Sequence, residues 1–253
     1  MATKLAEISI VTVVKDDATG LSSTVASLLS QTFLDWELLI IAGPSVDGTT
    51  DLAANFASQN SRITFHAEVG RGIYPAMNQG LAAVNSPFVW FMNAGDVFAN
   101  SSVLFEAHSI INKSDLGLVI GGYQVQRELK KDYVYSDRFL TPFRFAFSRR
   151  GGCHQAMIFN TKAIVKAGGF DESFSLAADF KLVLKIINNY RVMRVSKVFA
   201  IIEPGGASDL GIKKVHEEKH RIRLSELEGL HVGVFSSAWT FLVRTKMFLR
   251  KLL

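Results

Sequence analysis

The chain has 253 residues, of which 48% are hydrophobic and 20% charged, and its 28 basic and 23 acidic side chains give a formal net charge of +5. This composition supports a large folded core and excludes collagen-like, low-complexity and intrinsically disordered proteins. The single cysteine, Cys153, excludes an intrachain disulfide, which suits a reducing compartment. The start of the chain lacks the apolar stretch of a secretory signal. The longest uncharged run near its end, Val232 to Val243, is far shorter than the roughly 20 residues of a membrane span, so no transmembrane helix is expected.

Two hydrophobic periods alternate in the first half of the chain. Continuous apolar runs, typical of strands that are covered on both faces, alternate with segments whose apolar residues recur at helical spacing. The predicted strands are Ile8–Val14, Trp36–Ile41, Arg62–His66 and Phe88–Met92, and the predicted helices are Leu21–Gln31, Asp51–Ser58 and Pro75–Val84. This alternation predicts an α/β fold with a mainly parallel, doubly wound sheet and helices on both of its faces.

The pattern is less regular after Asn100. The predicted helices here are Ser102–Ile111, Thr161–Ala167, Ala178–Asn188 and Lys213–Leu230, and the predicted strands are Leu118–Tyr123 and Val195–Ile202. The segment from Gln124 to Arg150 mixes aromatic and basic residues without a clear period. We interpret it as a long excursion from the sheet, of the kind that is usually functional or mobile.

Polar residues follow each predicted strand of the first half, where an open parallel sheet binds its ligands. They include Lys15 to Asp17 after the first strand, Gly43 to Asp51 after the second, Glu68 to Arg71 after the third and Asn93 to Asp96 after the fourth. Neither G-x-G-x-x-G nor G-x-x-x-x-G-K is present, so the usual glycine-rich phosphate cradles are missing. A diphosphate at this edge needs another counter-charge, and a divalent metal ion held by Asp96 would supply it.

Five segments of the chain follow one another in a recognisable order: ISIVTVVKDD, SVDGTTD, GRGIYPAMNQGLAAVNSPFVWFMNAGD, CHQAMIF and GGFDESFSLAADF. Together they resemble the family 2 glycosyltransferases, over about Ile8 to Ser208. The likeness is to the bacterial branch that assembles extracellular and capsular polysaccharides, colanic acid among them. The resemblance implies a glycosyltransferase A-type fold, a nucleotide-diphosphate sugar as donor, Mg²⁺ or Mn²⁺ as cofactor and inversion at the anomeric carbon.

The resemblance also implies roles for single residues. Those that it places against the nucleotide-sugar are Thr12, Val14, Lys15, Asp47, Arg71, Met77, Asn78, Asn93, Ala94, Gly95 and Asp96. Of these, Asp96 ends the acidic motif and would bind the metal ion. His154 and Gln155 match a pair beside the sugar, and Asp179 matches the general base.

The chain departs from the family pattern in three of these motifs. The family often has Asp where this chain has Gly70, and again where it has Pro75. The acidic motif has Gly95 where a second Asp is common, which leaves the motif one carboxylate. Glu is frequent before the base, where this chain has Ala178.

The implied mechanism follows from charge. Asp179, with an ordinary or slightly raised pKa, would take the proton of the acceptor hydroxyl as that hydroxyl attacks the anomeric carbon. The metal ion at Asp96 and the guanidinium of Arg71 would stabilise the departing diphosphate. Attack from the opposite face inverts the anomer without a covalent sugar-enzyme intermediate.

Several of these residues also allow a purely structural interpretation. Asp47 and Asp51 can form a turn that caps the next helix. Asn93 to Asp96 can be a simple loop after a buried strand, and Asp179 can lie on a solvated helix face. In the company of the other motifs we favour the functional role for these carboxylates. His154 stays open between a sugar contact and a buried structural histidine.

The end of the chain, residues 229–253, is predicted to be a basic amphipathic helix. Its apolar residues recur at helical spacing from Ala238 to Leu252, and its basic residues fall largely on another face. Such a helix can lie in an anionic membrane interface, and the alternative is that it packs on the domain or on another subunit. Before it, His216 and His220 are four residues apart, which can indicate a metal pair, but we favour an exposed charged helix face.

We expect a single catalytic domain with a nucleotide-sugar-binding half, residues 1–115, an acceptor-binding half, residues 116–228, and the basic tail. The aromatic and basic residues from Arg138 to Phe147 suit stacking on nucleic acid or contact with a lipid-linked glycan. No nucleic-acid motif accompanies them, so we expect a lipid-linked glycan acceptor and no nucleic acid. The predicted location is the cytoplasm, peripheral on the inner face of the plasma membrane. The alternative function is that of a catalytically impaired relative that binds nucleotide and serves as an assembly subunit.

Overall fold

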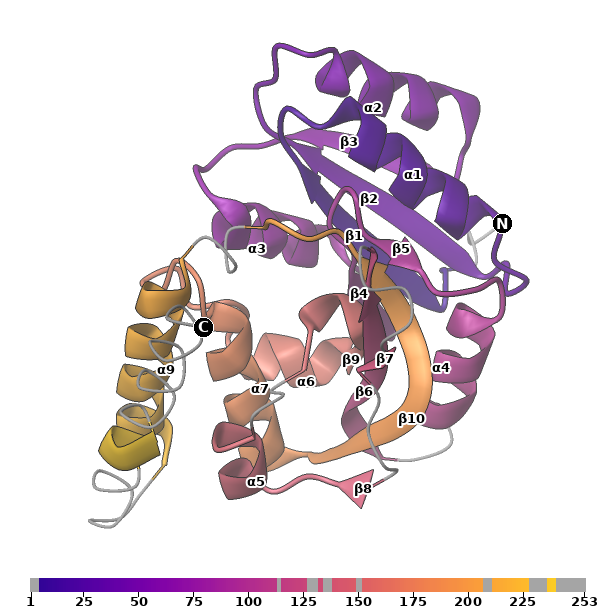
Figure 1. Ribbon diagram of the computed structural model, residues 1–253. Helices are drawn as coiled ribbons and strands as arrows, with labels where there is room; N and C mark the ends of the chain where they lie inside the picture. The colour runs from indigo at the N-terminus through magenta and orange to yellow at the C-terminus, as the bar shows by residue number, and fades with distance from the viewer. Residues whose placement is uncertain are drawn as a thin grey trace.

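The computed structural model describes residues 5–112, 115–126, 132–133, 138–148, 152–206, 211–227 and 236–239. Within them the chain folds around a ten-stranded sheet whose main order is β3-β2-β1-β4-β9-β6-β10-β5, with β7 beside β6 and β8 beside β10 (Figure 1). The strands are β1 Ile8–Val14, β2 Trp36–Ala42, β3 Ile63–Ala67, β4 Phe88–Phe91, β5 Val97–Phe98, β6 Leu116–Val125, β7 Asp132–Tyr133, β8 Arg138–Phe139, β9 Met157–Asn160 and β10 Arg191–Ile202. The helices are α1 Ala18–Leu29, α2 Thr49–Gln59, α3 Ile73–Ala83, α4 Val103–Ile111, α5 Pro142–Ala146, α6 Thr161–Lys166, α7 Ala178–Asn189, α9 Ile212–Glu226 and the 3-10 helix η2 His154–Ala156.

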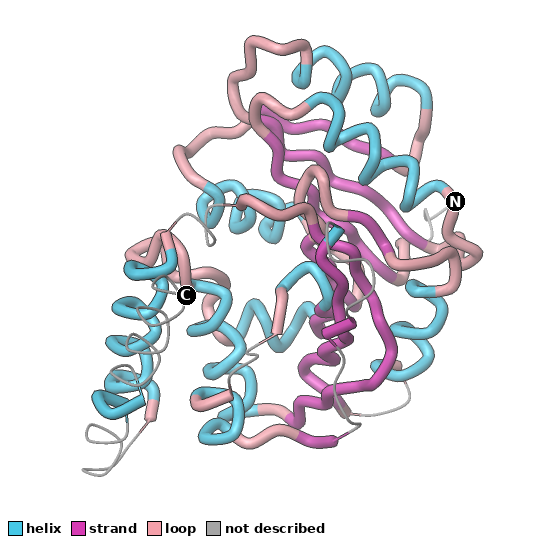
Figure 2. Tube along the Cα trace, viewed as in Figure 1, coloured by secondary structure: helices cyan, strands magenta, loops and turns pink. Residues whose placement is uncertain are grey.

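The first half of the sheet is parallel and covered on both faces. β1 lies between β2 and β4, pairs in parallel with both, and buries all of its residues. Ile8 and Ile10 of β1 belong to a core shared with α1, α2 and α4, whereas Val11 and Val13 belong to a core shared with α3, α6 and α7. Because successive side chains of a strand point to opposite faces, these two cores lie on the two sides of the sheet. The helices flank the sheet accordingly (Figure 2). This confirms the predicted doubly wound α/β fold.

β9 reverses the direction of the sheet at its centre. It lies between β4 and β6 and runs antiparallel to both, with Asn160 opposite Phe88 and Ile158 opposite Trp90. The sequence pattern did not predict this strand, which follows η2 directly and leads directly into α6. Its direction places its amino end, and with it η2, at the sheet edge where β1 and β4 end.

The end of β10 arrives at the same edge. β10 is a long strand that runs parallel to β6 and curves along the lower half of the sheet (Figure 1). The short strand β5, which follows the loop after β4, runs antiparallel to β10 and pairs Val97 with Ile201 and Phe98 with Ala200. The loop after β4 therefore lies directly beside the carboxyl end of β10.

Two predicted segments are only partly described. The excursion from Gln124 to Arg150 contains the end of β6, β7, β8 and α5, and its residues 127–131, 134–137, 149 and 150 lie outside the described ones. Of the predicted tail, 229–253, only 236–239 are described, and they are helical. There, Ser236 is buried with its Oγ 2.8 Å from His220 Nδ1, and the Trp239 ring lies 6.2 Å from that of Phe147. In the part of the chain with assigned structure, no helix combines the length and the apolar character that a membrane crossing requires.

Candidate functional site

A cavity of about 530 Å³ opens at the edge of the sheet where β1, β4 and β10 end. Its walls come from the loop after β4, η2, the segment before α7, the segment after β10, and one side of α9. Asp96, Asp179 and His154 all line it. Three of the motifs that lie far apart in the sequence thus meet in one space.

The loop after β4 is held firmly from α1. Thr24 of α1 is buried, and its Oγ1 donates to the carbonyl of Asp96 at 2.7 Å and to that of Asn93 at 3.2 Å. The Asp96 N–H donates to the carbonyl of Asn93 at 3.2 Å and closes a turn. Gly95 has a φ of +88° in this turn, a backbone conformation that favours glycine. The fixed loop sets the direction of the Asp96 side chain.

The Asp96 carboxylate is buried, with 5% of the residue exposed, and both of its oxygens accept hydrogen bonds. Oδ2 accepts from Gln155 Nε2 at 2.8 Å, and Oδ1 accepts from the Glu203 N–H at 2.9 Å. Burial raises the pKa of Asp96 to about 6, and the nearby Glu203 charge adds to the rise, whereas the two hydrogen bonds and His154 oppose it. A neighbouring cation would favour the ionised form.

Asp179 lies in the first turn of α7 and faces the same cavity. Its Oδ1 accepts from the Phe180 N–H at 2.8 Å and from the Tyr74 hydroxyl at 3.4 Å. Burial raises the pKa of Asp179, but His154, the charge of Lys219 and the Phe180 N–H outweigh burial and hold that pKa below its ordinary value. The sequence had led us to expect an ordinary or slightly raised pKa, so the structure makes this carboxylate a weaker base that stays ionised.

His154 connects the two acidic regions. Its Nδ1 lies 3.7 Å from Asp179 Oδ2, and its Nε2 lies 3.2 Å from Asn93 Nδ2. An amide nitrogen only donates, so Nε2 accepts in this contact and Nδ1 carries the proton that faces Asp179. The histidine is therefore held between the loop after β4 and the start of α7.

Two charged residues of the cavity were not found by sequence reasoning. Lys219 of α9 lines the cavity, where burial lowers its pKa and the charge of Asp179 opposes that effect. Glu203 follows β10 and also lines the cavity. No local motif marks either residue, because their positions depend on how α9 and β10 pack against distant segments.

α9 also holds the segment that leads into Asp179. Glu218 is buried, and its Oε1 accepts from the N–H and the hydroxyl of Ser175 at 3.1 and 3.0 Å. Its Oε2 accepts from the Leu176 N–H at 2.9 Å. These bonds lower the pKa of Glu218 against the effect of burial, so it stays ionised and fixes the approach to α7.

Several residues that the resemblance placed against the donor lie outside this cavity. Thr12, Val14 and Met77 are buried, and Lys15 and Arg71 are exposed. None of the five lines the cavity. Their assignment to the nucleotide-sugar stays a prediction.

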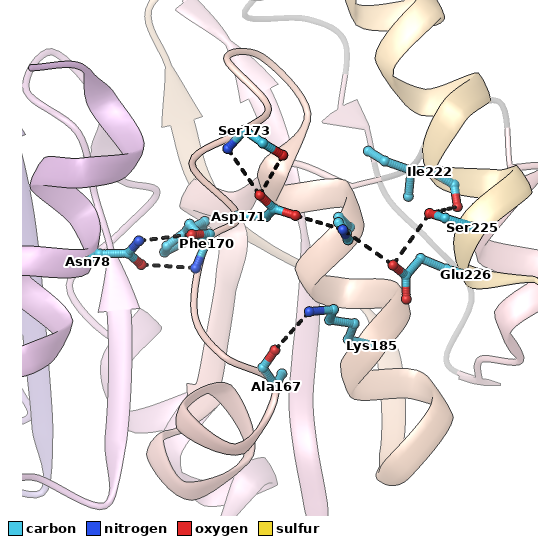
Figure 3. Close-up of polar contacts among 10 residues, drawn as sticks. Asn78, Ala167, Phe170, Asp171, Ser173, Lys185, Ile222, Ser225 and Glu226 are labelled. Carbon is cyan, nitrogen blue, oxygen red and sulfur yellow. Dashed lines mark hydrogen bonds and ion pairs between the residues drawn. The ribbon is translucent and has the colours of Figure 1, made fainter.

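Asp47 and Asn78 both make structural hydrogen bonds. Asp47 accepts from the Thr49 N–H at 3.1 Å and from the Ala18 N–H at 3.0 Å, so it joins the starts of α2 and α1. The Thr49 hydroxyl and these N–H groups lower the pKa of Asp47. Asn78 of α3 donates to the Phe170 carbonyl at 2.8 Å and accepts from the Phe170 N–H at 2.9 Å (Figure 3). Neither residue lines the cavity.

The site has oxygen ligands that fit a small divalent cation. Asn93 Oδ1 is buried and has no hydrogen-bond partner among the described residues. Asp96 lies in the same loop and adds a carboxylate. In the described ranges, no group of three His, Cys, Asp or Glu side chains is arranged to hold a metal ion. A small donor set of this kind suits Mg²⁺ or Mn²⁺, which keep several waters and bind phosphate oxygens.

Comparison with known sequences finds relatives along most of the chain. The family model described as "Glycosyl transferase family 2" matches residues 9–174. An uncharacterized glycosyltransferase of Mycobacterium tuberculosis (strain H37Rv) is 27% identical over 180 residues, which are 70% of this chain and 68% of that protein. The PGL/p-HBAD biosynthesis glycosyltransferase of Mycobacterium bovis (strain BCG) is 27% identical over 249 residues, which are 92% of this chain and 91% of that protein.

Solved structures of low sequence identity share the fold. TarS 1–349 of S. aureus in complex with UDP-GlcNAc superposes with a TM-score of 0.72 at 14% identity, covering 92% of this chain and 70% of that chain. The chain spans 41% of a longer TarS structure. The mannosyltransferase PcManGT of Pyrobaculum calidifontis, in complex with GDP-Man and Mn²⁺, gives a TM-score of 0.70 at 14% identity over 94% of this chain and 70% of that chain. The family match and the shared architecture show that this chain belongs to glycosyltransferase family 2 and has the glycosyltransferase A-type fold.

Proposed function

We propose that this protein is an inverting glycosyltransferase of bacterial surface polysaccharide synthesis. It moves a sugar from a nucleotide-diphosphate sugar to a hydroxyl of a lipid-linked glycan. The observation that carries the proposal is that Asp96 and Asp179 face one cavity and are connected through Asn93 and His154. A metal-binding acid and a general base on either side of one space are what the reaction needs.

The residues present divide the chemistry between them. Asp96, with Asn93 Oδ1, would hold Mg²⁺ or Mn²⁺, which supplies Lewis-acid stabilisation of the diphosphate when bound. Asp179 accepts the proton of the acceptor hydroxyl at a carboxylate oxygen. The hydroxyl oxygen forms a bond to the anomeric carbon while the bond from that carbon to the diphosphate oxygen breaks, and the nucleoside diphosphate leaves with the electron pair. His154 and the Tyr74 hydroxyl orient the base.

Relatives support the substrate classes. The solved neighbours include complexes with UDP-GlcNAc and with GDP-Man and Mn²⁺. One relative, WfgD of Escherichia coli, is named a UDP-Glc:alpha-D-GlcNAc-diphosphoundecaprenol beta-1,3-glucosyltransferase and is 24% identical over 105 residues, which are 42% of this chain and 41% of that protein. The donor is assigned to residues 1–115, which supply Asn93 and Asp96, and the acceptor to residues 116–228, which supply His154 and Asp179.

The test is release of nucleoside diphosphate by the purified protein from a panel of nucleotide sugars in the presence of Mn²⁺. We expect Asp96→Ala and Asp179→Ala each to reduce this turnover by about a hundredfold or more. Asp115→Asn, a change of an exposed carboxylate just before β6, is expected to leave turnover unchanged. Unchanged turnover in both alanine variants would rule out the assignment. A protein that binds the donor but releases no nucleoside diphosphate is the catalytically impaired relative.

The basic and amphipathic sequence of the tail also supports a location of the protein at a membrane surface. We propose that residues 229–253 attach the protein to the anionic, cytoplasmic face of the plasma membrane, where a lipid-linked acceptor is held. Flotation with vesicles of anionic phospholipid tests this. A chain cut after Leu230 is expected to stay in the soluble fraction, and undiminished flotation of that chain excludes an anchoring role for the tail.

A further inference from the structure

The register of β5 and β10 brings an acidic residue to the loop after β4. Val97 pairs with Ile201, and continuing this antiparallel register by two residues places Glu203 opposite Gly95. Two local observations agree with this placement. The Glu203 N–H donates to Asp96 Oδ1 at 2.9 Å, and a Cβ built on Gly95 would overlap Glu203 Oε2. The Glu203 carboxylate thus fills the space that a side chain at position 95 would take.

The backbone accounts for glycine at position 95. Its φ of +88° is strained for residues with a Cβ, and the space beside it is already taken by Glu203. A carboxylate on residue 95 and one on residue 203 would compete for one place. The loop after β4 therefore has glycine at position 95 where Glu203, at the end of β10, places its carboxylate.

We propose that Glu203 provides the second carboxylate of the metal site, in place of an acid at position 95. The inference rests on the proposed function. Glu203, Asp96 and Asn93 Oδ1 then offer the hard oxygen donors that Mg²⁺ and Mn²⁺ prefer. Among the described residues neither carboxylate forms an ion pair with Lys or Arg, so a cation would offset the repulsion between them. The cation is held between the end of β10 and the loop after β4.

Binding of Mn²⁺ itself tests this, followed by the electron paramagnetic resonance signal of the free ion as the protein is titrated. Glu203→Gln is expected to weaken Mn²⁺ binding by about tenfold or more. The control is the same change at the opposite edge of the sheet, Glu7→Gln before β1, which is expected to leave binding unchanged. Thermal unfolding of each variant without metal checks that the fold is intact. Binding by Glu203→Gln that equals wild-type binding overturns the inference.

A second pair of variants introduces an aspartate at position 95 of the loop after β4, with and without Glu203. In Glu203→Ala the space beside residue 95 is empty, so Gly95→Asp added to that variant is expected to recover part of the lost Mn²⁺ affinity. Gly95→Asp alone retains Glu203 and is expected to gain none, because the two side chains overlap. A gain of affinity by Gly95→Asp alone, equal to that in the double variant, overturns the inference.

The outcomes separate this inference from the proposed function. If Asp96→Asn loses Mn²⁺ and Glu203→Gln does not, the inference is wrong and the transferase function is untouched. If the wild-type protein binds no Mn²⁺, either alone or with UDP, the inference is wrong as well. If Mn²⁺ binding follows the expected pattern while no nucleotide sugar is turned over, the inference is supported and the proposed function fails.

Discussion

At the scale of single residues, the ionisation of Asp179 is set by a balance between burial and its neighbours. Burial raises its pKa, whereas His154, the Lys219 charge and the Phe180 N–H lower it by more. A general base works only when it is deprotonated, so a lowered pKa extends the range in which Asp179 can act toward acid pH. His154 is the largest of the lowering influences.

Replacing His154 should therefore move the acid limit of the reaction. In His154→Gln the ring N–H that faces Asp179 is lost, and with it the largest influence that lowers the pKa of Asp179, so this pKa rises. Because the protonated form is inactive, the acid limb of kcat should shift to higher pH. The measurement is kcat between about pH 4 and pH 8 at saturating donor and Mn²⁺. His66→Gln, an exposed change on β3, is the control. An acid limb that stays in place or moves to lower pH contradicts this account of Asp179.

The sequence predicted Asp96, His154 and Asp179 as candidate site residues, and all three line the cavity. Each could be proposed because it lies in a short motif whose residues are close along the chain. It did not locate Glu203 or Lys219. Glu203 reaches the site through the register of β5 against β10, and Lys219 through the packing of α9 against α7. These are contacts between segments far apart in the chain, and no local spacing encodes them.

At the scale of elements, ion pairs and hydrogen bonds hold α7 to the segment before it and to α9. Lys181 of α7 donates to Asp171 Oδ2 at 2.6 Å, before α7, and lies 3.5 Å from Glu226 Oε1 at the end of α9. The Ser173 N–H and hydroxyl also donate to Asp171 (Figure 3). These partners lower the pKa of Asp171 to about 2. The contacts of Lys181 therefore connect α7, which carries Asp179, to the segment before it and to α9.

Asp171→Asn should destabilise the protein by about 1 kcal/mol at pH 7, a value kept small because the carboxylate is partly exposed. The folded-state pKa lies below the unfolded value, so this stabilisation is present above about pH 4 and is lost as the pH falls toward 2. Urea unfolding of wild type and variant at pH 7 and near pH 3 measures the difference. The difference in the free energy of unfolding between wild type and Asp171→Asn should be smaller at the lower pH. Asp115→Asn, a change of an exposed carboxylate outside the helices, should show no difference from wild type at either pH. If the difference in the free energy of unfolding becomes larger at the lower pH, the ionised carboxylate of Asp171 is not the source of the stabilisation.

The long strands were easier to predict from the sequence than the short ones. β1 and β2 have seven residues each and are almost wholly buried, so their apolar runs were visible. β5, β7 and β8 have two residues each, which is too few for a period. β9 has four residues, as many as the predicted β4, but it lies directly between η2 and α6. Tertiary pairing, rather than local propensity, fixes them as strands.

At the scale of the whole molecule, the direction of β9 determines where the site forms. In the parallel half, β1 and β4 deliver their following loops to one edge. β9 runs the other way, so the segment before it, with His154 and Gln155, arrives at that edge too. β10 and the start of α7 complete the cavity. The fold class was predictable from alternating strands and helices, but the central antiparallel strand that brings the two halves together was not.

A ligand that bridges these elements should stabilise the whole fold. A complex of Mn²⁺ and nucleoside diphosphate would bind only the folded state. At a ligand concentration a hundredfold above Kd, this binding adds about 2.7 kcal/mol to the free energy of unfolding and raises Tm by roughly 5–10 °C for a chain of this size. The measurement is thermal unfolding with UDP or GDP, with Mn²⁺ and again with EDTA. We expect one nucleotide to raise Tm with Mn²⁺, and EDTA or Asp96→Asn to remove the rise. Asp179→Asn should keep the rise in Tm, because we propose that Asp179 acts on the acceptor and not on the diphosphate. If the rise in Tm persists both with EDTA and in Asp96→Asn, the diphosphate binds away from the loop after β4. The reaction would then also take place away from that loop.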